Sequence, residues 1–475
     1  MSDEKKITRR RYIKYAAAGV AAIAAAGAGA YYAQTMGPAP TQTQTLTQTV
    51  VGPTPTSTVA EDTGPLNFTQ WAFAPEVVKE NLDIFSKQYN EQVTQEVLIG
   101  ADYGALVETK FMSQAPLDVC YGFAFHAHRW YPANWIRNLS DIPDIDQIKS
   151  TLYPVSEFAM TSPIDNTLIG LPYCAFVHGA MQANELLLEK AGLTGQYPKT
   201  MAELIAQCET MKKKGVADTP YEPYWTSEEY GMWPFLGECH GRGDDLFDPK
   251  TFEPTFDTNT GAAQVLKDWR YLYDKELIPR GTLTATEGDH ISWFATGKYA
   301  YAQQSTYDNK RFNDPAQSQI AGHASFVPFA KEFTGELNNC MYVIANRPRG
   351  PQRLDRVKRL FLWFANKDQN GQYFAQKKWL IDYGITAGVK GLFEDPEVQA
   401  AFKKWVYRPE DIQTIQDNLQ NADFPLVWKT PWFLEWQRTM NAELRKCISG
   451  ETTIEQCISA LRDRANYLVK TYAHQ

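Results

Sequence analysis

Cysteine is scarce in this sequence and follows no metal-binding or redox spacing. Seven cysteines are spread over 475 residues, and no two of them form a Cys-x-x-Cys pair. Because that spacing is typical of zinc sites and dithiol redox centres, we predict neither. Cys447 and Cys457 flank a predicted turn between two helices, so a disulfide between them remains one alternative. If disulfides form, the odd number leaves at least one thiol unpaired.

Signatures of common enzyme classes are absent as well. The chain has no Gly-x-Ser-x-Gly elbow, no phosphate-binding glycine loop and no His-Glu-x-x-His motif, which argues against serine hydrolases, P-loop nucleotidases and zinc proteases. A glycoside hydrolase needs two carboxylates about 5 to 10 Å apart, and no such pair stands out. We therefore predict that the protein is not an enzyme and needs no cofactor, with an exported glycoside hydrolase as the weakest alternative.

A local excess of positive charge and a long apolar run occur together at the N-terminus. Residues 1–14 carry six Lys or Arg against Asp3 and Glu4, and no further charge appears until Glu61. The Ala/Gly-rich run of 19 residues from Tyr15 to Ala33 is long enough to cross a bilayer as a helix, and no second run of 18 apolar residues exists. This asymmetry keeps the head cytoplasmic while the run enters the membrane. The membrane is therefore expected to be contacted through the N-terminus only.

The basic head resembles a twin-arginine export signal. It reads Thr8-Arg9-Arg10-Arg11-Tyr12-Ile13-Lys14, with paired arginines before a large apolar residue and a lysine. The small residues 28–30 offer a cleavage site, so a cleaved signal and a retained anchor both remain open. A lipidated cysteine is excluded, because the first cysteine is Cys120.

Between the apolar run and the body lies a segment with too few apolar side chains to fold. Of the 27 residues from 34 to 60, nine are Thr, interleaved with Gln and Pro, and none is charged or aromatic. We predict a disordered stalk here, whose hydroxyls also suit O-glycosylation. The whole chain has a net charge of −8 and the head carries +4, so the remainder carries −12. That surplus disfavours nucleic acid as a partner.

The body of about 410 residues alternates strands and helices, which favours parallel α/β architecture in two lobes. The alternation predicts strands at 66–71, 95–99 and 117–121, helices at 75–89 and 103–114, a strand followed by two helices over 168–214, and further helices at 260–274 and 431–472, the last broken at Gly450. Within the 168–214 unit we expect a helix from 185 to 191, and a capping box formed by Thr200 and Glu203.

Four stretches of the body, taken in order, resemble the sugar-binding group of extracellular solute-binding proteins of ABC importers, the group that includes maltose-binding protein. They are Ile169–Leu193 with Pro198-Lys199-Thr200, Phe294–Ala300, Phe326–Phe329 with Met341–Ala345, and Trp436–Val469. The Thr-rich stalk is similar to that of archaeal members. The segment Phe123–Trp135 departs from the group's pattern, so the ligand stays open.

The resemblance implies a two-lobed periplasmic-binding-protein-like fold of type II, with a ligand cleft between the lobes. It implies a monomeric receptor at the extracellular face that captures a carbohydrate, most simply an oligosaccharide, and delivers it to ABC importer permease subunits. A receptor for a peptide, polyamine or polyol, or a surface display protein, are the alternatives. The expected boundaries are 1–33 signal or anchor, 34–64 stalk, 65–171 lobe 1, 172–340 lobe 2, 341–397 lobe 1 return segment and 398–475 C-terminal helices on lobe 2.

Sugar sites combine stacking aromatic rings with planar hydrogen-bonding side chains, and 13% of this chain is aromatic. Open α/β sheets place such sites beyond the carboxyl ends of their strands. For stacking we select Trp71, which lies at the end of the first predicted strand. The resemblance to the family implies five more stacking residues by their positions, namely Tyr173, Trp225, Trp233, Tyr307 and Trp432. For polar contacts we select Asp118, Arg129, Glu229 and Gln303.

His126 and His128 would face one way on a strand and suggest a metal site. With no cysteine nearby, a surface or cleft hydrogen-bonding role is favoured, and we predict no metal.

Overall fold

The computed structural model describes residues 62–99, 103–228, 230–347 and 349–473. The predicted signal or anchor and nearly all of the predicted stalk lie outside these residues. In the part of the chain that is described, no helix is both long and apolar enough to cross a membrane.

A five-stranded sheet forms the centre of the first lobe. Its strand order is β2 (Val93–Leu98), β1 (Leu66–Trp71), β3 (Val119–Phe123), β9 (Glu336–Ile344) and β4 (Leu171–His178). β1 pairs in parallel with β2 and β3, whereas β9 runs antiparallel to both β3 and β4. The carboxyl ends of β1 and β3 therefore meet at one edge of the sheet.

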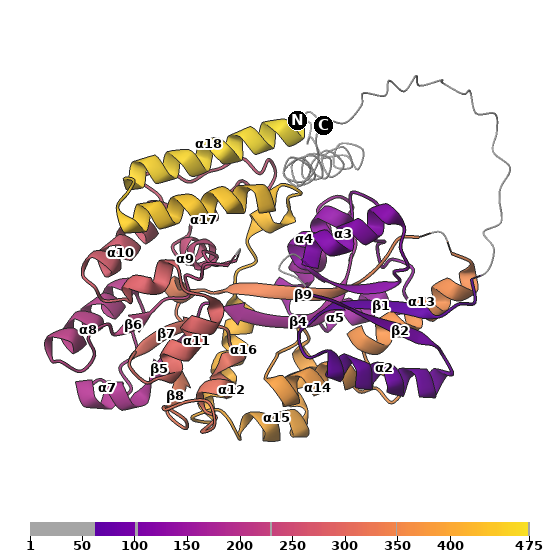
Figure 1. Cartoon of the computed structure of the whole chain (residues 1–475), viewed down its shortest axis with the longest axis horizontal. Coiled ribbons are helices and arrows are strands. Elements are labelled where there is room, and N and C mark those ends of the chain that lie inside the picture. Colours follow the sequence, from indigo (N-terminus) through magenta and orange to yellow (C-terminus); the bar gives the residue numbers. More distant parts are fainter. Residues whose placement is uncertain (1–61, 100–102, 229, 348, 474–475) are drawn as a thin grey trace, which may run out of the picture.

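A four-stranded sheet forms the second lobe, in the order β6 (Tyr221–Glu222), β7 (Tyr301–Gln304), β5 (Ala180–Asn184) and β8 (Ala324–Phe326). β5 follows β4 after the single residue Gly179, which has a positive φ of 71° that favours glycine. In Figure 1 the paired strands β4 and β9 run across the middle of the molecule between the two halves. The predicted two-lobed α/β fold is confirmed. Its sheets are mixed rather than parallel as expected, because β9 runs antiparallel to β3 and β4, and β5 runs antiparallel to β7 and β8.

Helices cover both sheets, and two long helices close the chain. Helices α17 and α18 form an antiparallel pair that packs on α10 of the second lobe (Figure 1). The helices are α2 (Pro75–Tyr89), α3 (Tyr103–Ser113), α4 (Ala124–Trp130), α5 (Ile145–Ser150), α6 (Pro154–Met160), α7 (Glu185–Ala191), α8 (Met201–Lys213), α9 (Pro234–Gly241), α10 (Gly261–Asp274), α11 (Glu287–Ala295), α12 (Asp308–Phe312), α13 (Pro351–Ala365), α14 (Phe374–Tyr383), α15 (Pro396–Phe402), α16 (Glu410–Asn421), α17 (Phe433–Ser449) and α18 (Ile454–Ala473).

Local sequence signals set several of these boundaries as predicted. The backbone N–H of Glu203 donates to the Thr200 hydroxyl at the start of α8, although the Glu203 carboxylate accepts from Lys199 N rather than closing a full capping box. α7 ends at Gly192 and α17 at Gly450, both in the left-handed conformation that glycine adopts without strain.

Three expectations need correction. The single strand expected in the 168–214 unit is two strands, β4 and β5. His126 and His128 lie on helix α4 rather than on a strand, and both are buried rather than on the surface. Cys447 and Cys457 are free buried thiols, as are the other five cysteines.

Candidate ligand-binding cleft

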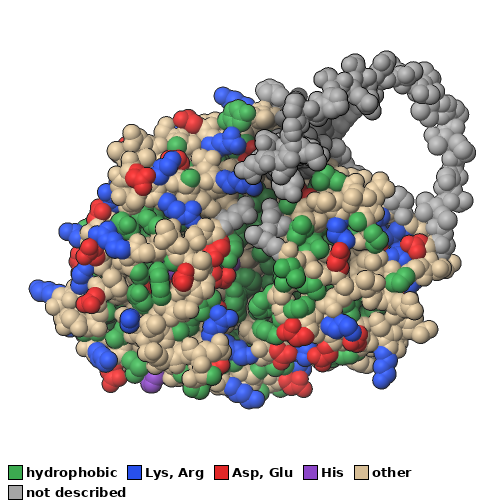
Figure 2. Space-filling model, viewed as in Figure 1, with side chains coloured by type: hydrophobic (Ala, Val, Ile, Leu, Met, Phe, Trp, Pro, Cys, Tyr) green, Lys and Arg blue, Asp and Glu red, His purple; other side chains and the backbone are tan. Residues whose placement is uncertain are grey.

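A small pocket lies between the two lobes, at the edge where β1 and β3 end. Its volume is about 170 Å³. The space-filling surface is hollowed between the lobes, and hydrophobic side chains gather in that hollow (Figure 2). Residues from both lobes and from both connecting strands line the pocket: Trp71, Phe73, Phe123, Tyr173, Cys174, Phe176, His178, Tyr230, Trp233, Glu287, Tyr307, Asn338, Cys340 and Ile385.

A β-bulge shapes the floor of the pocket. The register between β4 and β9 shifts between Pro172 and Cys174, so Tyr173 has no partner in the ladder. Successive residues of a regular strand face opposite sides, yet both Tyr173 and Cys174 reach the pocket. The bulge therefore places the Tyr173 ring on the face of β4 that already carries Cys174, Phe176 and His178.

Aromatic rings form the wall contributed by the first lobe. The Trp71 and Phe123 rings are stacked, with centroids 5.2 Å apart and planes at 23°. Tyr173 meets Trp71 edge-on at 5.6 Å. Trp71 is only partly buried, so part of its ring surface remains open for a ligand.

The wall from the second lobe combines rings with one carboxylate. Tyr230 and Trp233 pack at 5.7 Å, and Trp233 Nε1 donates to Gln437 Oε1 at 2.7 Å, which ties this wall to α17. Phe176 and Tyr307 meet edge-on at 4.9 Å. Glu287, the first residue of α11, is the only carboxylate among the described residues that line the pocket.

Three tyrosine hydroxyls converge on the Glu287 carboxylate. Tyr224 donates to Oε1 at 2.7 Å and Tyr230 to Oε2 at 2.8 Å, while Tyr307 lies 3.4 Å from Oε1. Burial raises the pKa of Tyr230, and the nearby Glu287 charge and hydrogen bond raise it further. The tyrosines are therefore neutral donors that hold the carboxylate in place.

His178 is a neutral, fully engaged member of the pocket. Its Nε2 accepts from the Asn338 amide at 2.9 Å, and its Nδ1 donates to the Ser305 hydroxyl at 2.9 Å. Burial lowers the pKa of His178 from 6.5 to about 3. This side chain fixes the positions of β4, β9 and the segment after β7 relative to one another, and it brings no charge to the cleft.

Four of the ten selected residues come together in this pocket, namely Trp71, Tyr173, Trp233 and Tyr307. Glu229 lies outside the described residues. The other five, Asp118, Arg129, Trp225, Gln303 and Trp432, do not line it.

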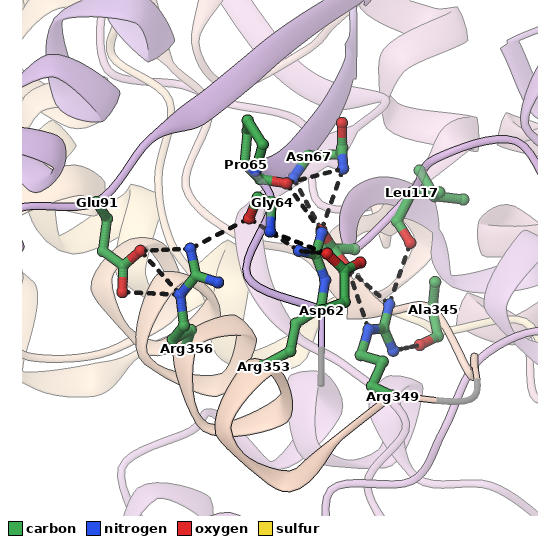
Figure 3. A network of polar contacts seen from close by, with 11 residues as sticks. Asp62, Gly64, Pro65, Asn67, Glu91, Leu117, Ala345, Arg349, Arg353 and Arg356 are labelled. Atoms are coloured by element: carbon green, nitrogen blue, oxygen red, sulfur yellow. Dashed lines mark hydrogen bonds and ion pairs between the residues drawn. The ribbon is translucent and has the colours of Figure 1, made fainter. Parts of the chain in front are cut away.

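Asp118 lies at the opposite end of the sheet, just before β3. Its side chain is 3% exposed and pairs with Arg349 at 2.9 Å and Arg353 at 2.7 Å. Its Oδ2 also accepts from the backbone N–H of Asn67 at 2.9 Å. Figure 3 shows Arg349 and Arg353 converging beside Asn67, with Arg353 also reaching the carbonyl of Gly64. Asp118 therefore holds the start of β1 to α13, which corrects our assignment of it to the ligand.

The remaining polar candidates are likewise taken up by partners within the protein. Arg129, on α4, is buried and pairs with Glu108 at 3.1 Å. Gln303 donates to the buried Glu238 carboxylate at 3.0 Å. Both side chains satisfy buried carboxylates, which would otherwise be costly. We therefore remove Arg129 and Gln303 from the set of candidate ligand contacts.

The remaining two tryptophans are core residues. Trp225 is completely buried and packs on Trp269, with ring centroids 4.5 Å apart. Trp432 is 4% exposed and packs on Phe247 at 5.8 Å. Neither ring has a free face for stacking, so the ligand role that we assigned to them is corrected to core packing.

Sequence reasoning missed most of the residues that β4 and β9 contribute. Cys174, Phe176 and His178 alternate along β4, and Asn338 and Cys340 alternate along β9, so each set shares one face of its strand. The pairing of Cys174 with Cys340 and of Phe176 with Asn338 brings the two sets together. The alternation is visible in the sequence, but which face meets the cleft depends on the pairing.

A larger hollow of about 980 Å³ lies near Asp118, at the amino ends of β1 and β3. Arg347, Arg349 and Arg353 line it, and the last two are engaged with Asp118. Among the described residues, no group of three His, Cys, Asp or Glu is placed to hold a metal ion.

Similarity to known proteins agrees with this architecture. The family model for bacterial extracellular solute-binding proteins matches residues 83–404. The structure is similar to maltose-bound MalE3 of T. maritima, with a TM-score of 0.69, 18% identity, and coverage of 85% of this chain and 99% of that one. It is also similar to the sugar-binding protein MalE of Xanthomonas citri, with a TM-score of 0.69, 17% identity, and coverage of 86% and 98%.

A third similar structure is an ABC transporter solute-binding protein from Agrobacterium vitis with bound D-mannitol, with a TM-score of 0.66, 17% identity, and coverage of 86% and 98%. No curated protein sequence matches the chain. Since the family model spans more than half of the residues, this chain belongs to the family of bacterial extracellular solute-binding proteins.

Proposed function

We propose that this protein is an extracellular receptor that captures a carbohydrate between its lobes and delivers it to an ABC importer. The observation that carries the proposal is the pocket between the lobes, which eight aromatic residues line. Rings with open faces suit the C–H faces of sugars, and a few fixed polar groups orient the ligand. Several similar structures hold or are named for sugars, which supports the same class of solute.

The size of the pocket favours a ligand that extends beyond it. Pockets that enclose drug-sized ligands measure roughly 300 to 1,000 Å³, and this one measures about 170 Å³. One end of an oligosaccharide would occupy it, while the remaining units would lie along the hollow between the lobes (Figure 2). Closure of the lobes would then cover those units.

The connecting strands provide the mechanism of closure. β4 and β9 carry Phe176, His178 and Asn338 of the pocket, and each leads from one sheet toward the other. A ligand that touches these strands and both lobes binds the closed arrangement better than the open one, and this difference in affinity drives the change.

We further propose lobe 1 as residues 65–171 with the return segment 341–397, and lobe 2 as residues 172–340 with the helices of 398–475. β4 and most of β9 fall in the second range by number, but they pair into the first sheet and connect the two lobes. The contacts of α17 and α18 with α10 support the last assignment. The protein would act as a monomer, held at the membrane by residues 1–33, without catalysing a reaction.

A ligand screen tests the proposal. The purified chain would be heated with mono- and oligosaccharides, and with amino acids, short peptides and polyamines as other classes. We expect a saturable rise of several degrees in Tm with one class of sugar, because a ligand that binds only the folded state stabilises it. Responses confined to another class would refute the carbohydrate assignment while leaving the fold intact. No rise in Tm with any class of ligand would favour a surface display protein.

A further inference from the structure

We propose that the Glu287 end of the cleft binds a protonated amine, so that the carbohydrate captured is an amino sugar or an oligomer that ends in one. The proposal rests on the proposed function and specifies its ligand. It follows from a ring-lined end of the pocket whose one lining carboxylate, Glu287, forms no ion pair with a cation of the described chain.

The first observation is the bonding of Glu287. A carboxylate offers about four acceptor positions. The hydroxyls of Tyr224, Tyr230 and Tyr307 direct at most three hydrogen bonds to this one, two of them to Oε1 and one to Oε2. One acceptor position on Oε2 therefore remains, and Glu287 lines the pocket into which a ligand would enter.

The second observation is the surrounding charge. Both oxygens of the Glu228 carboxylate accept from the backbone N–H of Glu287 at 3.1 Å, so a second acid lies against the start of α11. Asp308 is 1% exposed, and neither of its carboxylate oxygens has a hydrogen-bond partner. Burial raises the pKa of Asp308 well above its usual range, and the nearby Glu287 charge raises it further. Glu228 and Asp308 thus lie close to Glu287, and of these three acids Glu287 is the one that lines the pocket.

The third observation concerns the basic side chains near these acids. Within the described part of the chain, neither Glu287 nor Asp308 forms an ion pair with Lys or Arg, and Glu228 forms none either. Arg311, exposed on α12, acts on Asp308 only through space, and Arg445 acts on Glu228 in the same way. His178 is neutral because its pKa is about 3. A neutral sugar would leave this negative potential uncompensated.

The rings around Glu287 favour the same ligand. Tyr230 and Trp233 lie at 54° to each other, and Phe176 and Tyr307 at 87°, so the rings form walls of a box rather than one flat platform. The faces of aromatic rings carry partial negative charge and attract cations, most strongly when water is excluded. An ammonium group entering this box would meet ring faces on its sides and the free Oε2 position at its end.

The test compares oligomers of glucosamine with N-acetylated oligomers of the same length, which are neutral, using isothermal titration of the purified full chain. We expect the cationic oligomer to bind at least tenfold more tightly at low ionic strength, and the difference to shrink as salt rises. In Glu287→Gln the preference should disappear, because an amide keeps the shape and one acceptor oxygen but loses the charge.

Two controls keep the result specific. Glu276→Gln removes a carboxylate that is 59% exposed and paired with Arg280 on the surface, so it changes net charge equally and should keep the preference. Thermal unfolding of Glu287→Gln without ligand checks that this variant folds. If it fails to fold, the salt dependence of the wild-type chain decides: a preference for the cationic oligomer that does not shrink as salt rises would overturn the inference.

The outcomes separate the two proposals. Equal binding of cationic and neutral oligomers, or an unchanged preference in Glu287→Gln, would overturn the inference and leave the carbohydrate receptor standing. Binding of spermidine with no response to any sugar would overturn both. Binding of a neutral sugar without any binding of glucosamine oligomers would overturn the inference and support the broader function.

Discussion

Polar side chains near the two ends of the first sheet are bonded in opposite ways. At the amino ends of β1 and β3, Asp118 is enclosed by Arg349 and Arg353, and both carboxylate oxygens are engaged. At the carboxyl ends, Trp71 presents a partly open ring, and Glu287 is held by neutral tyrosines without a cation. Polar groups that the chain satisfies by itself belong to the scaffold, whereas those it leaves partly unsatisfied are available to a ligand.

The same comparison shows why cavity size alone does not locate the binding site. The hollow at the amino ends measures about 980 Å³, against about 170 Å³ for the aromatic pocket. Two of the arginines in the larger hollow already have a carboxylate partner, and they bond to the carbonyls of Gly64, Pro65, Leu117 and Ala345 (Figure 3). The smaller pocket holds the open rings and touches both lobes.

Removal of the Asp118 charge should have the largest effect on stability. Asp118→Asn leaves Arg349 and Arg353 buried without their shared carboxylate, and breaking a buried ion pair costs about 3 to 5 kcal/mol. We expect a fall of this size in the free energy of unfolding, measured by urea denaturation, with sugar affinity of the folded fraction unchanged.

A surface carboxylate provides the matched control for that experiment. Asp141 pairs with Arg137 and Lys358, but its side chain is 43% exposed. Exposed pairs contribute about 0 to 1 kcal/mol, so Asp141→Asn should shift the free energy of unfolding far less. Equal losses in the two variants, or lost sugar binding in Asp118→Asn, would contradict the division between scaffold and cleft.

The features of the fold and the site that could be predicted are those whose interacting residues lie close together in the sequence. Helix Pro75–Tyr89 was predicted from Val78, Leu82 and Phe85, which repeat within one turn or two, and its bounds are confirmed. Strand Leu66–Trp71 was predicted from alternation and is confirmed as well. Such signals are local, so the chain order of strands and helices and the two-lobed fold followed from them.

Three of the four polar candidates, Asp118, Arg129 and Gln303, do not line the pocket, and the opposite reason applies to them. Asp118 bonds to Arg353 across 235 positions and Gln303 to Glu238 across 65, and no local pattern reveals that such side chains are already engaged. Two aromatic candidates that lie in strands reaching the cleft, Trp71 and Tyr173, do line the pocket. Trp225 and Trp432 were chosen by position in a family pattern, and their burial was invisible in the sequence.

At the cleft end, acidification should destabilise the protein through His178. Its pKa is about 3 when folded and 6.5 in the unfolded chain, so below pH 6.5 the unfolded chain binds a proton that the folded chain does not. The free energy of unfolding therefore falls as the pH drops. Between pH 7.5 and 5 this group alone lowers it by about 2 kcal/mol, since one pKa unit is worth about 1.4 kcal/mol.

The contribution of His178 is isolated by comparison with His178→Gln. Other titrating groups, including buried acids with raised pKa, change both proteins equally. We expect the wild-type chain to lose about 2 kcal/mol more than the variant between pH 7.5 and 5, as measured by denaturant unfolding at each pH. Parallel curves for the two proteins would mean that His178 accepts its proton without disrupting the bonds to Ser305 and Asn338.

The smallest effect, but the most direct on function, is expected for Trp71. Its ring is partly exposed at the end of β1, so Trp71→Ala removes stacking surface at a modest cost in stability. Loss of one aromatic contact is worth about 1.4 kcal/mol, or tenfold in affinity, as read by titration with the sugar found in the screen. Tyr467→Ala, which removes a ring that is 58% exposed on α18, is the control and should bind normally.

Because Trp71 and Asp118 lie at opposite ends of neighbouring strands, Trp71→Ala should weaken binding with little loss of stability, and Asp118→Asn should do the reverse. Equal losses of affinity in Trp71→Ala and Tyr467→Ala would place the ligand elsewhere on the molecule.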